Sequence, residues 1–86
     1  MYTLAISEVL DKKLQKLERK SKKQLEAINK KIQQILESPY HFKPLRGDVH
    51  GAREVHIDKS FVLTYEIDEK NKTVKFLDYD HHDKIF

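Results

Sequence analysis

The chain of 86 residues contains no cysteine and no tryptophan, and it has only two prolines and two glycines. Without cysteine, it can form no disulfide, no thiolate metal site and no cysteine nucleophile. This composition is consistent with a reducing compartment, so we expect a cytoplasmic protein. The sequence has no long apolar run and no charged-then-apolar leader. We therefore expect neither a membrane-spanning helix nor a signal peptide.

Positive charge is concentrated in the first half of the chain, although the formal net charge is only +3. Residues 1–46 contain eleven Lys and Arg against five Asp and Glu, whereas residues 47–86 contain six against nine. A basic half favours a polyanionic partner, because each phosphate that a cation neutralises releases counterions. The alternative is that these lysines only solvate the surfaces of helices, and charge alone does not separate the two interpretations.

Hydrophobic periodicity in the first half predicts a strand followed by two helices. Residues 2–6 alternate between apolar and polar side chains, as a half-buried strand does. Ser7 is a suitable N-cap for the first helix. Ser21 and Gln24 form a capping box for the second helix, which should stop at Pro39. Each helix has one apolar stripe, and the short connection between them predicts an antiparallel hairpin.

The second half predicts a loop and then three strands. All four Pro and Gly residues lie within residues 39–51, which we interpret as a loop. Apolar and polar side chains then alternate in residues 53–58, 61–68 and 73–79. The chain is expected to be a single α+β domain over residues 1–86, of order β-α-α-β-β-β. In this fold the helical hairpin covers one face of a twisted, mostly antiparallel four-stranded sheet. The other face is expected to be open and to carry Glu54, His56 and Thr64.

Five histidines follow the predicted helices, at positions 41, 50, 56, 81 and 82. An imidazole titrates near neutral pH and can act as a general base or a general acid. His56 lies on the second predicted strand and His82 lies just beyond the last one. If these strands are neighbours, about 4.8 Å apart, the two imidazoles can flank a single phosphodiester. Lys43, Arg46 and Arg53 are the cations expected to hold the phosphate.

A site of this kind suits metal-free cleavage of RNA. One imidazole removes the proton of the ribose 2′-OH and the other protonates the leaving 5′-oxygen, each contributing roughly 10²–10⁴-fold. Cations stabilise the phosphorane that forms between these steps. Phe86 can offer a platform on which a base of a single-stranded substrate stacks. This chemistry needs no cofactor, and none is predicted.

Each candidate also has a purely structural interpretation. His56 can be a solvated strand residue, Phe86 can cover a sheet edge, and the lysines around the helix–helix turn can be solvated charges. The two adjacent histidines near the end of the chain could hold a metal ion together with Asp80 and Asp83. However, neighbouring residues of a strand point to opposite faces, so joint ligation would need an irregular backbone. A metal site is therefore the weakest option.

Several segments together resemble one group of proteins. They are "KPLRG" at residues 43–47, "GAREVHID" at residues 51–58, "FVLTYEID" at residues 61–68 and the closing "HDKIF". With the order of elements, they are similar to the RelE/ParE toxin superfamily, and above all to its histidine-bearing branch typified by YafQ. The resemblance implies a RelE-like fold and a ribosome-dependent mRNA interferase. Such an endoribonuclease cuts mRNA in the ribosomal A site and is neutralised by a small RelB-like antitoxin.

The resemblance also implies which residues act. Arg53 and His56 match the G-x-R-x-x-H strand of the YafQ branch, and His82 and Phe86 match its H-x-x-x-F tail. Lys43 stands where that branch has a loop histidine. The implied catalytic residues are His56, His82, Arg53 and Lys43.

The chain departs from the pattern of that branch just before the third predicted strand. An acidic residue followed by an aromatic residue is expected there, and this chain has Ser60 and Phe61. The carboxylate is missing, although Asp58 is close by. The aromatic ring is kept, so Phe61 is predicted to contact the substrate together with Arg46 and Phe86.

Two other functions share parts of this pattern. A ParE-like toxin has the same fold but poisons DNA gyrase, which gives the histidines no role. A non-catalytic module would only hold RNA or a protein partner. The paired histidines favour the nuclease, for which we expect an antitoxin, the ribosome and mRNA as partners. The basic helices, with Lys20, Lys22 and Lys23 at their junction, would contact ribosomal RNA, and no membrane is involved.

Overall fold

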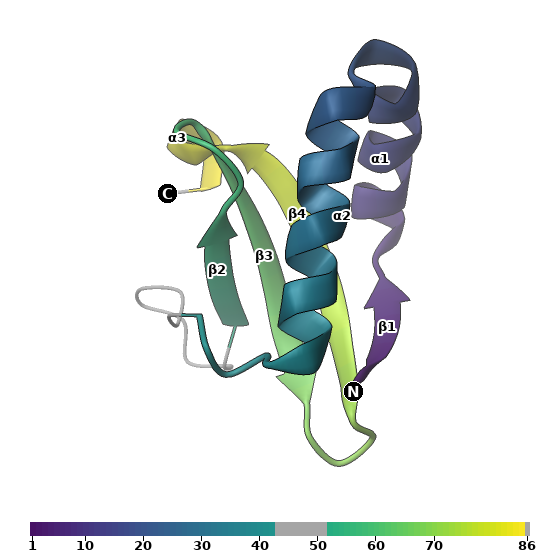
Figure 1. Cartoon of the computed structure of the whole chain (residues 1–86), viewed down its shortest axis with the longest axis vertical. Coiled ribbons are helices and arrows are strands. Elements are labelled where there is room, and N and C mark those ends of the chain that lie inside the picture. The colour runs from purple at the N-terminus through teal and green to yellow at the C-terminus, as the bar shows by residue number, and fades with distance from the viewer. Residues whose placement is uncertain (43–51, 86) are drawn as a thin grey trace.

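The protein, seen in a computed structural model, forms two layers and is described for residues 1–42 and 52–85 (Figure 1). A four-stranded sheet makes one layer and a hairpin of two helices makes the other. The elements are β1 (Thr3–Ile6), α1 (Glu8–Lys20), α2 (Lys22–Glu37), β2 (Ala52–His56), β3 (Phe61–Asp68), β4 (Thr73–His81) and α3 (His82–Ile85). This order confirms the predicted α+β fold and adds one short terminal helix.

The strands lie in the order β1-β4-β3-β2. β1 runs parallel to β4, whereas β3 is antiparallel to both β2 and β4. The sheet is therefore mostly antiparallel, as predicted. β2 and β4 are not neighbours, however, because β3 lies between them. The condition on which His56 and His82 were expected to flank one phosphodiester, that their strands are neighbours, is therefore not met.

One residue of β4 has no opposite partner in the sheet. Thr64 pairs with Asp78 and Tyr65 pairs with Phe76, so Leu77 is an extra residue and forms a β-bulge. The hydroxyl of Ser7 donates a hydrogen bond of 2.6 Å to the carbonyl oxygen of Leu77. The start of α1 is thereby fixed to the bulge.

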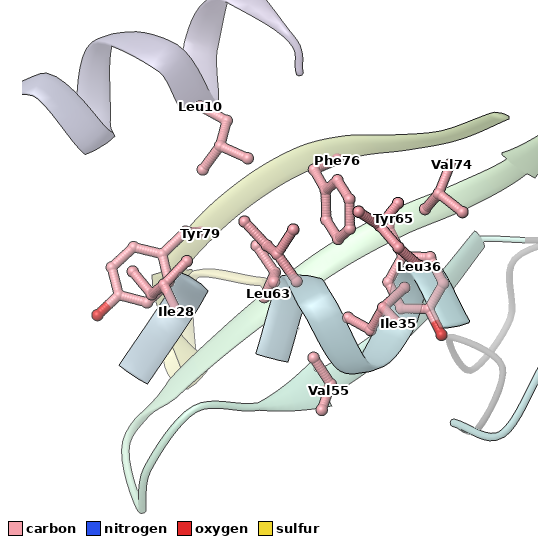
Figure 2. Packing of buried hydrophobic residues seen from close by; sticks show 11 residues of the cluster. Leu10, Ile28, Ile35, Leu36, Val55, Leu63, Tyr65, Val74, Phe76 and Tyr79 are labelled. Carbon is pink, nitrogen blue, oxygen red and sulfur yellow. The ribbon is translucent and has the colours of Figure 1, made fainter. Parts of the chain in front are cut away.

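The core lies between the helical hairpin and the sheet, and it follows the predicted apolar stripes (Figure 2). The helices contribute Leu10, Ile28, Ile32, Ile35 and Leu36, and the sheet contributes Val55, Leu63, Tyr65, Val74, Phe76 and Tyr79. Fully burying one such aliphatic side chain stabilises the fold by about 1.5–3 kcal/mol. Packing of these side chains, more than helix propensity, holds the hairpin in place. Within the described residues, no helix combines the length and apolar character that crossing a membrane requires.

Both predicted helix caps are present, but the second is not a complete capping box. The Ser7 side chain accepts from the backbone N–H of Leu10, and the Ser21 side chain accepts from that of Gln24. The Gln24 side chain does not return to Ser21. Its amide donates to Asp58 at 3.2 Å and to the Tyr79 hydroxyl at 2.5 Å. Gln24 therefore ties α2 to the sheet instead of closing the cap.

The face of the sheet turned away from α1 and α2, here called the far face, is less open than predicted. Its side chains, by strand pairing, are Glu54, His56, Val62, Thr64, Glu66, Lys75, Asp78 and Asp80. The side chains at its centre, Glu54, Val62 and Thr64, are only 6%, 0% and 5% exposed. His56 and Lys75 are exposed, so this face is accessible at the end of β2 and on β4 beside Glu66, but not at its centre.

Candidate active site

The imidazole rings of His56 and His82 lie together where β2 ends and α3 begins. Their centroids are 5.9 Å apart and their planes are inclined by 22°. Both side chains are exposed, His82 to 47%. Two exposed imidazoles at this separation can act on the same small group of substrate atoms.

The rings meet because the chain turns sharply after β4. Two strand spacings, about 10 Å, separate β2 from β4. His82 is not on a strand, however, but is the first residue of α3. Its backbone N–H donates to the carbonyl oxygen of Ser60 at 2.7 Å, so α3 begins beside the turn that precedes β3. This turn also follows His56, which explains the short distance between the rings.

Asp58 organises the turn between β2 and β3. One of its carboxylate oxygens accepts from the backbone N–H groups of Ser60 and Phe61 at 2.8 and 3.2 Å, and the other accepts from Gln24. The bond from Ser60 is the largest of the influences that lower the pKa of Asp58. Both oxygens of Asp58 therefore already accept hydrogen bonds that fix the turn, and this carboxylate does not replace the one missing at position 60.

Asp83 is a carboxylate beside the imidazole pair that was considered from sequence only as a metal ligand. Its oxygens lie 3.7 Å from Nδ1 of His81 and 3.8 Å from Nδ1 of His82. A carboxylate on this side can orient an imidazole whose other nitrogen takes part in proton transfer. Asp83 is 84% exposed, so solvent screens its charge. The only signal in the sequence is its place next to the paired histidines.

His81 and Phe61 lie on the helix-facing side of the sheet. The Phe61 ring stacks on Tyr79, with centroids 5.1 Å apart, and packs against the core. His81 approaches the same ring edge-on at 5.6 Å. The structure therefore does not bring Phe61 to the imidazole pair, and its observed contacts are those of a packing residue. The two adjacent histidines also have different surroundings, because His81 is the last residue of β4 and His82 is the first residue of α3.

Arg53 is also directed away from the imidazole pair. Its Nη1 donates to the carbonyl oxygen of Phe42 at 2.6 Å, and its Cζ lies 5.1 Å from the centroid of the Tyr40 ring. Arg53 and His56 are three positions apart on β2, so their side chains point to opposite faces. The structure does not place Arg53 where it could hold a phosphate between His56 and His82.

Glu54 shares the far face with His56, two positions earlier on β2. It is 6% exposed, and its Oε2 has no hydrogen-bond partner in the described part of the chain. Burying a carboxylate oxygen without a donor is costly, so an unpaired oxygen of this kind is unusual. Nothing in the sequence pattern distinguishes Glu54 from a solvated strand residue.

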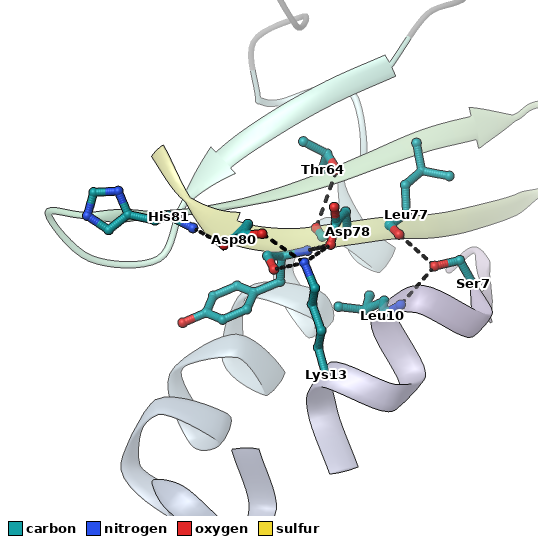
Figure 3. A network of polar contacts seen from close by, with 9 residues as sticks. Ser7, Leu10, Lys13, Thr64, Leu77, Asp78, Asp80 and His81 are labelled. Atoms are coloured by element: carbon teal, nitrogen blue, oxygen red, sulfur yellow. Dashed lines mark hydrogen bonds and ion pairs between the residues drawn. The ribbon is translucent and has the colours of Figure 1, made fainter. Parts of the chain in front are cut away.

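Lys13 neutralises two further carboxylates of the far face, reaching them from α1 at the edge of β4 (Figure 3). Its ammonium group lies 2.7 Å from Asp78 and 3.0 Å from Asp80, and it also donates to the carbonyl oxygen of Tyr79. Burial lowers the pKa of Lys13, but the hydrogen bonds to both carboxylates together raise the pKa by more than burial lowers it. The net change is therefore upward. This ion pair reduces the negative charge that a phosphate would meet near His82.

The remaining predicted site residues, Lys43, Arg46 and Phe86, lie outside the described residues. Among the side chains that are described, no three His, Asp or Glu residues form a group that could hold a metal ion. The candidate site therefore consists of His56 and His82, with Asp83 beside them.

The sequence and the fold both match known toxins. The YafQ family model, described as a bacterial toxin of type II toxin–antitoxin systems, matches residues 2–86. A protein of Methanocaldococcus jannaschii named "Putative toxin RelE4" is 52% identical over 86 residues, which cover 100% of this chain and 92% of that protein.

Solved structures share the fold at lower sequence identity. A chain of the E. coli RelBE toxin–antitoxin complex is 26% identical, with a TM-score of 0.78 over 92% of this chain and 94% of that chain. The YoeB/ParE toxin from Agrobacterium tumefaciens is 18% identical, with a TM-score of 0.84 over 93% of this chain and 98% of that chain. With the family match over almost its whole length, the chain belongs to the YafQ family of bacterial type II toxins, within the RelE/ParE superfamily.

Proposed function

We propose that this toxin is a ribosome-dependent endoribonuclease that cleaves mRNA in the A site and so inhibits translation. The observation that carries the proposal is the pair of exposed imidazoles of His56 and His82, 5.9 Å apart. Such a pair supplies both a general base and a general acid near neutral pH. The protein acts in the cytoplasm, where ribosomes are found.

The reaction follows from the two imidazoles. One removes the proton from the ribose 2′-OH, whose oxygen attacks phosphorus to form a pentacoordinate phosphorane. The other protonates the 5′-oxygen as the P–O5′ bond breaks, which leaves a 2′,3′-cyclic phosphate and a free 5′-hydroxyl. The roles of His56 and His82 can be exchanged in this scheme. No metal ion or cofactor is required for these proton transfers.

Further residues complete the proposed site. Lys43 and Arg46 bind the phosphate and stabilise the phosphorane, and Phe86 stacks on a base. Arg53 and Phe61 are left out of this set, because their side chains contact the helix-facing side of the sheet. A sparse site of this kind gains from a ribosome that holds the mRNA in place.

Exposed cations on the helices support a ribosomal partner. They lie along α1 and at its junction with α2, and none of them forms an ion pair within the described part of the chain: Lys12, Lys16, Arg19, Lys20, Lys22 and Lys23. A cluster of this kind neutralises RNA phosphates and makes binding salt-dependent. Replacing Lys20, Lys22 and Lys23 by Gln should flatten the salt dependence of ribosome binding, and an unchanged slope would remove this contact from the proposal.

The test of the nuclease replaces each proposed catalytic histidine and uses His81, the neighbour of His82, as the control. Purified parent, His56→Ala, His82→Ala and His81→Ala proteins are added to translating ribosomes, and the 5′ ends of the mRNA are mapped. We expect His56→Ala and His82→Ala to lower the cleavage rate by roughly 10²–10⁴-fold. His81→Ala removes a neighbouring imidazole that faces Phe61, and should leave the rate within a few-fold of the parent.

The outcomes separate the nuclease from its rivals. If both His56→Ala and His82→Ala cut mRNA like the parent, the proposed acid and base are wrong. A ParE-like toxin would instead cause DNA damage on expression, with the histidines dispensable. A non-catalytic module would bind ribosomes without producing any mRNA ends in the A site.

We further propose that a RelB-like antitoxin covers the apolar edge formed by β1 and the start of α1. β1 is an edge strand, and Leu4, Ile6 and Val9 are 45%, 37% and 55% exposed. An apolar group at a sheet edge is typical of a protein interface. Val9→Glu should weaken binding of the antitoxin encoded beside the toxin gene, whereas Lys30→Glu on α2 should not. Equal binding by both variants would place the antitoxin elsewhere.

A further inference from the structure

The segment that follows α2 is attached to the sheet by hydrogen bonds with residues of β2, β3 and the turn after β3. The buried Tyr65 hydroxyl donates to the carbonyl oxygen of Pro39 at 2.8 Å. The Tyr40 hydroxyl donates to Glu69 at 2.7 Å. Arg53 holds the last described residue of the segment, Phe42, through its carbonyl oxygen. Residues 39–42 are therefore anchored on the same side of the sheet as the helices.

Arg53 makes two different contacts with this segment at once. Nη1 donates to the Phe42 carbonyl oxygen at 2.6 Å, while the guanidinium group lies 5.1 Å from the centre of the Tyr40 ring. A guanidinium group can donate in its plane while its face lies against an aromatic ring, with a cation–π attraction. A lysine ammonium group has neither the plane nor the fork of donors. The geometry is thus specific for arginine and not only for positive charge.

The alternative role for Arg53 is to bind the phosphate of the RNA. That role needs its charge beside His56 and His82, which lie on the other side of β2. The hydrogen bond to Phe42 fixes the guanidinium group on the helix-facing side. Arg53 can therefore affect the reaction only by positioning the residues that it contacts.

We propose that Arg53 is a positioning residue for the RNA cleavage proposed above. It fixes Phe42, which directly precedes Lys43 in the sequence, and it does not bind the phosphate itself. The inference rests on the proposed function for its effect on catalysis. Its structural part, the anchoring of Tyr40 and Phe42 by Arg53, can be tested without any activity.

The structural test uses hydrogen exchange in Arg53→Lys, Arg53→Met and the parent. The backbone N–H of His41 donates to Ser38 at 3.1 Å and reports opening of the segment. We expect exchange at His41 to be about tenfold or more faster in both Arg53 variants, with little change at core amides. Lys75→Met, which removes an exposed cation from β4, should leave this exchange unchanged. Parent-like exchange at His41 in Arg53→Lys would overturn the inference.

The kinetic test distinguishes anchoring from phosphate binding. If Arg53 anchors the segment, Arg53→Lys and Arg53→Met should lower kcat by similar factors of about tenfold or more. If it binds phosphate, Arg53→Lys should keep most of the activity, and Arg53→Met should reduce the salt slope of RNA binding by about one. That second pattern would overturn the inference. If the parent protein cuts no RNA, the proposed function fails, and hydrogen exchange still decides whether Arg53 anchors the segment.

Discussion

The backbone N–H of His82 donates to the carbonyl oxygen of Ser60 at 2.7 Å, so the start of α3 is attached to the turn between β2 and β3. Through this bond, the end of β2 and the start of α3 present their imidazoles to the same place. The geometry of the pair depends on this turn as much as on the histidines themselves.

Loosening that turn should impair cleavage more than stability. Asp58→Ala removes the carboxylate that accepts from Ser60 and Phe61, so Ser60 no longer has a fixed position beneath His82. We expect kcat to fall about tenfold or more, while the free energy of unfolding falls by about 1 kcal/mol. Single-turnover cleavage measures the effect on the reaction rate, and urea unfolding measures the free energy of unfolding.

Asp68→Ala is the matched control for Asp58→Ala. Asp68 accepts from the backbone N–H of Asn71 in the turn between β3 and β4, at the other end of the sheet. A similar loss of stability without loss of kcat is expected. Equal kinetic effects of the two substitutions would show that the turn at Asp58 has no special role.

The two histidines should act as one unit in catalysis. The double variant His56→Ala/His82→Ala is expected to lose little more activity than either single variant, because acid and base catalysis support the same phosphoryl transfer. Single-turnover rates of the four proteins give the coupling between the two residues. Losses that simply multiply would mean that the imidazoles act on separate steps.

Removing Lys13 should destabilise the edge of β4. In Lys13→Met, Asp78 and Asp80 face each other without a cation, and the carbonyl oxygen of Tyr79 loses a donor. We expect the free energy of unfolding to fall by about 1–2 kcal/mol, and by less at high salt. Urea unfolding of Lys16→Met, an exposed lysine on the same helix, is the control and should change by about 0.5 kcal/mol or less. Equal effects of the two substitutions would contradict the assigned role.

Glu69 should make stability depend on pH in acid. Its pKa is lowered from 4.5 to about 2, chiefly by the hydrogen bond from Lys72 and then by those from the Tyr2 and Tyr40 hydroxyls. Between these values the unfolded chain binds a proton that the folded chain does not, so stability present above about pH 4.5 is lost as the pH falls towards 2. The urea midpoint of Glu69→Gln should fall less steeply in this range than that of the parent. Equal steepness would mean that Glu69 is not held in this network.

Much of the fold was predictable because periodicity is a local property of the chain. The strand at Phe61–Asp68 has the predicted limits, and both helices start after the predicted serine caps. α3 was not predicted, because four residues carry too little pattern to indicate a helix. The order of the strands was also beyond the sequence pattern, since it depends on contacts between distant segments.

For the site, part of the arrangement was implied by the sequence and part was not. Arg53 and His56 are an odd number of positions apart on a predicted strand, so their opposite directions were already implied by alternation. Phe61 likewise belongs to the apolar set of its strand. By contrast, the burial of Glu54 on the far face depends on tertiary packing that no local pattern reports.

The unpaired residue of β4 decides which of the two final imidazoles can meet His56. Upstream of Leu77 the even-numbered side chains Val74 and Phe76 belong to the core, whereas downstream of it the odd-numbered Tyr79 does. Deleting Leu77 would leave these faces unchanged, because Phe76 and Asp78 already pair with the adjacent residues Tyr65 and Thr64. A change of length in the regular part of the strand would instead turn the residues after it to the opposite face. An insertion or deletion of a single amino acid in that regular part would therefore alter the candidate site more deeply than most replacements of its side chains.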